Sequence, residues 1–559
     1  MSSARIDNPV NSSDMESDER PIWKSVSVVA LVTLGSRVCG LVRDLVTAAF
    51  FGAGNSTDAF LLAFRIPNML RRLVADGALS AAFIPVFSSA QKEGAEQAKK
   101  TYYEVLNFCL LASVLLSAIG IYLAEPIVLL FAPGFASSEK FELAVALLRI
   151  MFPYVTLVSL LALCSGTLNS LGSFALPAAA PIFFNISLIV SIVTMFRWFS
   201  EPTYALAYGV VVGGIFALIP QLLLLWLKGY SFSFDSLRNF RTIQDSKAVR
   251  ELLRLMLPSL IGASIFQLMA LVNSILASML ADGTISWLYY ADRLFQFPLG
   301  VFTVAVSTTL LPKLSSLATE SRNEEFSALL RDALCWVSFI TIPASAALIY
   351  LSVPIVKICF EYRAFGPEDT AATASSLVGY AAGLWALSCH SILVRAFFAR
   401  KSSTIPALVT LISVLFNVII AIALMGPAVG TDKNLLTQIV SSVQSLLGVA
   451  QLAHFGIALA GSSAALVSLV VLTLFLPSVG ISLEKIPILK SVTISLISAA
   501  LMLGSLFGLK SLIPSVYILV PIAVPVGIIC YLAATFALGS EEAKRLIQTL
   551  AKAVRTFLE

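Results

Sequence analysis

Long apolar segments follow one another along this chain, and short polar stretches separate them. Each segment is long enough for the ~20 residues that a helix needs to cross a membrane, and none shows the alternation of a spanning β-barrel. We therefore predict an all-α integral membrane protein with about 14 transmembrane helices. The expected spans are 25–51, 58–90 (long and broken), 105–131, 143–168, 176–196, 204–227, 255–281, 286–311, 332–356, 374–399, 405–426, 446–477, 489–513 and 515–538.

The segment pattern repeats weakly at a long period. Four matches occur in order at offsets between 227 and 232, and they pair Gly35 with Gly262, Pro85 with Pro312, Pro177 with Pro406 and Asn185 with Asn417. Both repeats begin and end on the same side of the membrane, which makes the repeat parallel. Two six-helix halves followed by two C-terminal helices are the architecture of a transporter with a central site.

This repeat predicts the organisation of the whole chain. The expected parts are a polar N-terminal extension (1–21), an N-lobe (22–227), a basic linker (228–254), a C-lobe (255–477), two further helices (489–538) and a tail (541–559). The tail has apolar and basic residues at the spacing of an amphipathic helix, which suits the surface of the inner leaflet.

Composition and charge agree with a membrane protein and give it an orientation. The chain is 58% hydrophobic and 12% charged, with a net charge of +5. Basic residues gather in one set of alternate loops and are scarce in the other, where Asp282 stands alone. The positive-inside rule then places both termini in the cytoplasm. The positive charge reflects this loop bias and does not indicate nucleic-acid binding.

Several charged residues lie inside or beside the apolar spans. A guanidinium near the centre of a membrane helix costs roughly 2.5 to 3.5 kcal/mol, so such residues should face a water-filled cavity or a charged ligand. Arginine can pair with phosphate oxygens through two parallel hydrogen bonds, which favours an anionic substrate. The candidate substrate-binding residues are Arg37, Arg43, Asp58, Arg71, Arg72, Asp76, Asp292 and Arg293.

Structural alternatives stay open for several of these residues. Arg43 could extend to the membrane surface. Arg72 and Asp76 are spaced for a pair within one helix, and Asp292 with Arg293 could be a local pair. Helical geometry favours Arg72 over Arg71 for the cavity, because Arg72 shares a helix face with Asp58.

Several long strings in this chain match a known protein family. They are Ser36–Asp44, Phe51–Gly54, Thr57–Phe60, Ile66–Leu73, Gly77–Pro85, Ser286–Leu294, Leu310–Pro312 and Arg395–Arg400. These strings resemble the MurJ (MviN) lipid II flippase family. The resemblance implies a member of the multidrug/oligosaccharidyl-lipid/polysaccharide exporter superfamily in the bacterial inner membrane. Its expected substrate is the undecaprenyl-pyrophosphate-linked peptidoglycan precursor, carried from the inner to the outer leaflet.

Residue roles follow from the same resemblance. The family's cavity arginines fall on Arg37, Arg43, Arg71 and Arg293, so the resemblance favours Arg71 where helical geometry favours Arg72. Asp58 and Asp76 match acidic positions of the family, and the two extra helices are similar to those that hold the polyprenyl tail. Expected partners are lipid II, membrane lipids and the peptidoglycan synthesis and division machinery. A sodium site of the family falls here on neutral Asn273 and Asn417, which argues against it.

Other functions find little support in the sequence. His390 and His454 lack a catalytic or metal-ligand spacing, the seven cysteines show no CxxC pair, and no phosphate-binding GxxxxGK[ST] motif occurs. We therefore expect no catalytic residues, no cofactor and no metal site. The alternatives are an exporter of another polyprenyl-linked glycan or amphiphile, and a membrane-bound glycosyltransferase, for which the loops are short.

Overall fold

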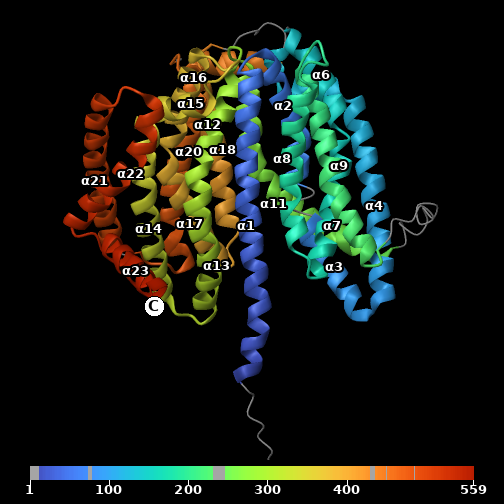
Figure 1. Ribbon diagram of the computed structural model, residues 1–559, viewed down its shortest axis with the longest axis horizontal. Helices are drawn as coiled ribbons and strands as arrows, with labels where there is room; N and C mark the ends of the chain where they lie inside the picture. Colours follow the sequence, from blue (N-terminus) through green and yellow to red (C-terminus); the bar gives the residue numbers. More distant parts are fainter. Residues whose placement is uncertain are drawn as a thin grey trace, which may run out of the picture. The chain divides into compact units, whose positions relative to one another are not determined.

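The computed structural model consists of helices, without a strand among the described residues, which are 12–73, 79–136, 138–230, 246–427, 435–447, 450–483 and 485–558 (Figure 1). The first part of the chain forms α1 (Ser12–Phe51), α2 (Asn55–Leu70), α3 (Ser80–Glu93), α4 (Ala95–Tyr122), α5 (Ala124–Phe131), η2 (Pro133–Phe135), α6 (Glu139–Met151), α7 (Tyr154–Ser170), α8 (Ala175–Met195) and α9 (Thr203–Leu227).

The second part begins with α11 (Lys247–Ser278), α12 (Thr284–Pro298), η4 (Leu299–Thr303), α13 (Val304–Thr319), α14 (Asn323–Tyr350) and α15 (Ser352–Phe360). It continues with α16 (Pro367–Ala381), α17 (Leu384–Ala399), α18 (Thr404–Leu424), α19 (Leu435–Leu447), α20 (Ala453–Phe475) and η5 (Leu476–Val479). It ends with α21 (Lys485–Leu512), α22 (Val516–Ala537) and α23 (Glu541–Leu558).

Membrane-spanning helices dominate the chain, as the sequence predicted. Nine helices within the described residues are long and apolar enough to cross a bilayer, or ten if α16 and α17 form one span bent by 43°. The predicted count of fourteen is therefore not confirmed. The four remaining predicted spans fall on α1, on α2 with α3, on α11, and on α12 with α13. α2, α3, α12 and α13 have 14 to 16 residues each, so none of them is long enough to be identified as a span by itself.

Interruptions occur where proline or glycine weakens the helical ladder. The chain leaves α12 at Pro298 and continues through the five-residue π-helix η4, as expected from this proline. The second predicted span breaks into α2 and α3. Gly77 and Asp76 lie outside the described residues.

The contacts divide the chain into two compact units. Unit 1 contains Met1–Thr47, Ala63–Ala124 and Ala146–Ala263, and unit 2 contains Ala48–Leu62, Glu125–Val145 and Ser264–Glu559. Two segments of the predicted N-lobe thus pack with the second unit. The division into an N-lobe at 22–227 and a C-lobe at 255–477 stays a prediction.

Unit 1 is held together by close helix packing. α8 and α9 approach closely because α9 has glycine at the contact: a Cβ atom on Gly209 would lie 2.9 Å from the Cβ of Ser191. The Ser191 hydroxyl also donates to the Ala205 carbonyl at 2.7 Å. Small residues and buried hydroxyls are common devices where lipid supplies no hydrophobic force between helices.

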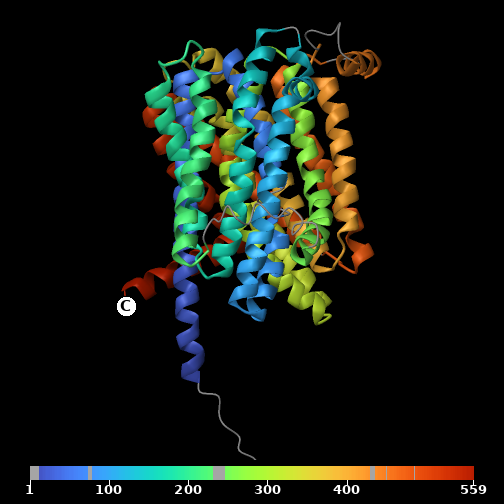
Figure 2. The ribbon, with the colours of Figure 1, turned by 90° about the vertical axis from the view of Figure 1, so that its right-hand side faces the viewer.

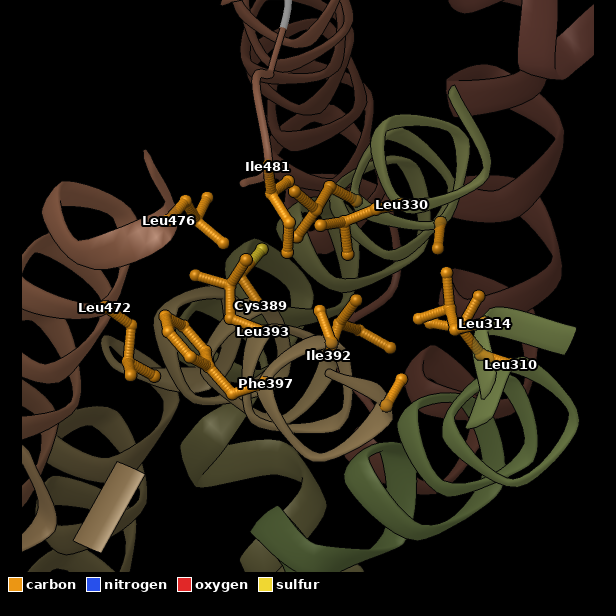
Figure 3. Packing of buried hydrophobic residues seen from close by; sticks show 14 of the residues in the cluster. Leu310, Leu314, Leu330, Cys389, Ile392, Leu393, Phe397, Leu472, Leu476 and Ile481 are labelled. Atoms are coloured by element: carbon orange, nitrogen blue, oxygen red, sulfur yellow. The ribbon is translucent and has the colours of Figure 1, made fainter. Parts of the chain in front are cut away.

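Unit 2 contains a tightly packed apolar cluster formed by α13, α14, α17 and α20 (Figure 3). Leu314, Leu330, Ile392 and Phe397 are fully buried in it. α18 packs against α20 as α8 packs against α9, which agrees with the predicted repeat. α21 and α22 pack against each other beside α14 (Figure 1).

Two helices near the surface complete the fold. α19 occupies part of the stretch for which the sequence suggested only a loop, and its Gln444 amide donates to the Ile422 and Gly426 carbonyls at 3.2 and 2.6 Å. α23 confirms the helix predicted for residues 541–559. One side of each of these helices packs against other helices, and each also carries exposed apolar residues, such as Leu446 at 85% exposure.

Candidate functional site

Unit 1 contains an ionic cluster on α1. The Arg43 guanidinium donates to Asp44 Oδ1 from Nε at 3.0 Å and from Nη2 at 2.7 Å, and Nη1 donates to Asn185 Oδ1 at 3.0 Å. The side chain of Arg43 is 15% exposed and that of Asp44 is 5% exposed. The positive charge of Arg43 is therefore offset by the Asp44 carboxylate, and its guanidinium is oriented by Asn185 of α8.

Arg37 has a different environment on the same helix. Its side chain is exposed, and no described residue forms a hydrogen bond or an ion pair with its guanidinium. Arg37 precedes Arg43 by six residues, which turns it by about 120° around the helix axis. The two arginines thus occupy different faces of α1, one compensated and the other open.

Arg71 and Arg72 follow directly after α2. Arg71 is half-buried and donates from Nε to Asn68 Oδ1 at 3.0 Å, whereas Arg72 is exposed. The structure therefore gives the two arginines different surroundings but does not select one of them as a ligand. Asp76, the remaining candidate of this span, lies outside the described residues.

Asp58 caps a helix of unit 2. Its Oδ2 accepts from the Gly283 amide at 2.7 Å, and its Oδ1 accepts from the amide and the hydroxyl of Ser286 at 2.9 and 2.6 Å. The carboxylate is 1% exposed and lies at the N-terminus of α12, where free amides and the helix dipole favour negative charge. Because three donors already occupy it, this carboxylate has a structural role in the observed conformation.

Asp292 and Arg293 lie farther along α12. Both are half-buried. The Arg293 guanidinium stacks on the Tyr289 ring with its Cζ 4.7 Å from the ring centroid, and Nη2 donates to the Tyr289 hydroxyl at 3.2 Å. Asp292 Oδ2 accepts from Gln296 Nε2 at 2.7 Å. The stacking fixes the guanidinium plane, and α12 itself is fixed by Asp58 at its start.

A second ionic contact joins segments from different parts of the sequence. Asp282, which stands alone in its loop, is paired with Lys140. The Lys140 ammonium is buried and lies 4.7 Å from the centroid of the Phe135 ring. Lys140 was overlooked in the sequence because a single lysine in a short loop has no recognisable spacing.

The same region of unit 2 contains close backbone contacts. The Ala364 amide donates to the Ala49 carbonyl at 3.1 Å, and Arg363 stacks 4.7 Å from the centroid of the Phe50 ring. Gly52 has a φ of 66°, and a Cβ atom there would lie 2.4 Å from the Ala364 carbonyl oxygen. Residues 48–62 are thereby held against the helices of unit 2.

The described residues contain no group of three or more His, Cys, Asp or Glu side chains that could hold a metal ion. The candidate residues fall into two sets, one in each unit. Unit 1 contains Arg37, Arg43, Arg71 and Arg72, and unit 2 contains Asp58, Asp292 and Arg293. Asp44 and Asn185 were not among the candidate residues of the sequence analysis, although an amide inside an apolar span was a usable signal.

Comparisons with known proteins identify the family. The family model described as lipid II flippase MurJ matches residues 47–525. A probable lipid II flippase MurJ of Buchnera aphidicola is 38% identical over 398 residues, which cover 71% of this chain and 77% of that protein. The lipid II flippase MurJ of Burkholderia cenocepacia is 36% identical over 387 residues, which cover 69% and 75%.

Solved structures agree with this assignment. A lipid II flippase MurJ in an inward closed conformation is 27% identical, with a TM-score of 0.71 and coverage of 91% of this chain and 97% of that chain. An inward-facing multidrug resistance MATE family transporter of the MOP superfamily shares the fold at 14% identity and a TM-score of 0.63, covering 81% and 99%. This chain belongs to the MurJ lipid II flippase family.

Proposed function

We propose that this protein moves lipid II from the inner to the outer leaflet of the bacterial inner membrane by alternating access. The observation that carries the proposal is the presence of arginines within apolar spans of a chain of this family. A guanidinium inside a span is costly unless it meets water or an anion, and the pyrophosphate of lipid II supplies the anion. Transport, without a catalysed reaction, then supports peptidoglycan synthesis.

Arg37 is the principal ligand in this proposal. Its guanidinium is exposed and forms no hydrogen bond or ion pair with the described residues, so it can pair with two phosphate oxygens at once. Arg71 and Arg293 add charge from other helices, and Tyr289 holds the Arg293 guanidinium ready for binding. Arg43 remains close to Asp44, so it contributes a weaker attraction. Partial compensation of this kind allows the site to release its substrate as well as to bind it.

The contacts around Asp58 hold residues 48–62 against the start of α12, and we propose that transport must break them. These contacts are called the closure below. Within unit 2, Asp58 binds Ser286 and Lys140 binds Asp282, so segments from early in the chain are held against later ones. A substrate can shift the balance of two states only through a difference in its affinity for them. We propose that release of lipid II on the far side requires residues 48–62 to separate from the start of α12.

A reversible crosslink tests this proposal. Cysteines at Asn55 and Asp282 flank the contact at which a Cβ on Gly283 would lie 3.2 Å from the Ala53 carbonyl oxygen. Oxidation of the double variant in a cysteine-free background should stop the appearance of lipid II in the outer leaflet, and reduction should restore it. The two single variants control for loss of the Lys140 contact. Normal transport by the oxidised protein would rule out alternating access at this closure and favour a static path.

Labelling tests the orientation that gives transport its direction. We expect both termini in the cytoplasm, with α19 outside. A cysteine at the exposed Ser445 should react with an impermeant thiol reagent in intact cells, and one at the exposed Lys100 should react only after lysis. Ser246 is unsuitable as an inner site, because it is buried and donates to Glu104. The opposite labelling pattern would reverse the inferred direction.

A further inference from the structure

The C-terminal helix α23 begins with a sharp and well-defined turn. α22 ends at Ala537, and Gly539 follows two residues later with a φ of 77°. The amides of Gly539 and Ser540 donate to the Phe536 and Thr535 carbonyls at 3.1 and 2.9 Å. Ser540 then caps α23, since its hydroxyl accepts from the Ala543 amide at 3.3 Å. The chain therefore changes direction directly at the end of a membrane-spanning helix.

The first turns of α23 are fastened to unit 2. Glu542 is 9% exposed and accepts from the Ser491 hydroxyl of α21 at 2.8 Å. Arg545 donates to Asp332 Oδ2 of α14 at 3.1 Å. Ala543 is buried and Leu546 packs against the apolar cluster that contains Tyr531. The start of α23 is thus held by α14, α21 and α22.

The apolar face continues after these contacts end. Ile547 is 46% exposed, and the sequence repeats the apolar spacing at Leu550, Val554 and Leu558. α23 has 18 residues, about 27 Å of helix, and its far end projects away from α14, α21 and α22 (Figure 2). The apolar spacing of the sequence therefore continues beyond the turns of α23 that pack against unit 2.

The position and charge of α23 indicate what covers this face. Ile529 and Phe536 of α22 are exposed up to its last turn, and the exposed Leu538 follows the helix directly. We therefore place the hydrocarbon boundary at the base of α23. Basic residues accompany the apolar face at the exposed Lys544 and Lys552 and, in the sequence, at Arg555. A helix with apolar and cationic faces at this depth fits an anionic membrane surface.

We infer that α23 is a binding site for anionic phospholipid headgroups at the membrane surface where the chain ends. Its apolar face enters the interface and its lysines contact the lipid phosphates. Since Glu542 and Arg545 connect α23 to α21 and α14, bound lipid would also hold the ends of these helices at the membrane surface. This inference is independent of which substrate the protein carries.

A local probe tests the inference on the full chain. The exposed Ala551, one turn after Ile547, is replaced by cysteine in a cysteine-free background and labelled with an environment-sensitive fluorophore. The protein is placed in nanodiscs of phosphatidylcholine with or without phosphatidylglycerol. We expect a blue shift of the emission that needs phosphatidylglycerol and declines with added salt.

Charge variants provide the decisive comparison. Lys544→Gln with Lys552→Gln should weaken the phosphatidylglycerol dependence, roughly fivefold for each cation removed. Lys99→Gln with Lys100→Gln, exposed lysines on α4, should leave the signal of the probe unchanged. Emission that is the same in both lipids, or insensitive to the α23 lysines, would overturn the inference. Gel filtration of each variant verifies that it is folded.

Discussion

Two buried carboxylates, Asp44 and Asp58, have opposite relations to the arginines of the candidate site. Asp44 in unit 1 binds the Arg43 guanidinium and so reduces the positive charge available to a ligand. Asp58 in unit 2 binds neutral donors at the start of α12, and its hydrogen bonds are independent of any arginine. In the proposed site, Asp44 offsets the charge of one arginine, whereas Asp58 fixes the start of the helix that carries Arg293.

The difference teaches that a charge in an apolar span does not by itself indicate ligand binding. Burying a charge is tolerated when hydrogen bonds or an opposite charge replace water. Arg37 meets neither condition among the described residues, since its guanidinium is exposed and without a partner there. An arginine left open in this way is a stronger candidate ligand than Asp58, whose donors are already in place.

Arg37→Ala should have the largest effect on function. It removes the proposed pyrophosphate ligand and should abolish growth in a complementation test. The amount of protein in the membrane should stay near normal, because Arg37 forms no hydrogen bond or ion pair with the described residues. Arg37→Lys should restore little, since the charge remains but bidentate pairing is lost. Lys357→Ala, which removes a cation paired with Glu361, serves as control. Normal growth with Arg37→Ala would remove this residue from the mechanism.

Asp58→Ala should have the next largest effect, and on stability more than on binding. The substitution leaves the Gly283 and Ser286 amides without an acceptor, and hydrogen bonds to a charged group contribute about 1.5 to 3 kcal/mol each. We expect a clear fall in the thermal unfolding temperature of the purified protein and unchanged affinity of the folded fraction for lipid II. Ser286→Ala removes one of the three hydrogen bonds and should lower the temperature less. Unaltered stability with lower affinity would instead place Asp58 in the substrate site.

Substitutions at Asn185 should have the smallest effect of the three on the protein, and they test whether Arg43 is a ligand. Asn185→Asp adds a second carboxylate beside Arg43, so affinity for lipid II should fall several-fold, whereas Asn185→Ala removes one hydrogen bond and should change affinity less. Binding of lipid II to purified protein in nanodiscs measures both. Asn417→Asp at the matching position of the second half is the control, because no arginine is bonded there. Equal effects of Asn185→Asp and Asn417→Asp would show that Arg43 is not a ligand.

The sequence by itself determined the fold class, the broken second span, the amphipathic C-terminal helix and the family. These follow from hydropathy, from proline and glycine, and from long matching strings, all of which are local properties of the chain. It also singled out Arg37, whose charge within an apolar span is visible without knowledge of any neighbour.

Only the tertiary structure decided what each buried charge contacts. Asp58 looked like Arg37 in the sequence because its partners lie more than 200 residues away. Lys140 escaped notice for the same reason, since its pairing with Asp282 requires the fold that brings the start of α6 beside a distant loop.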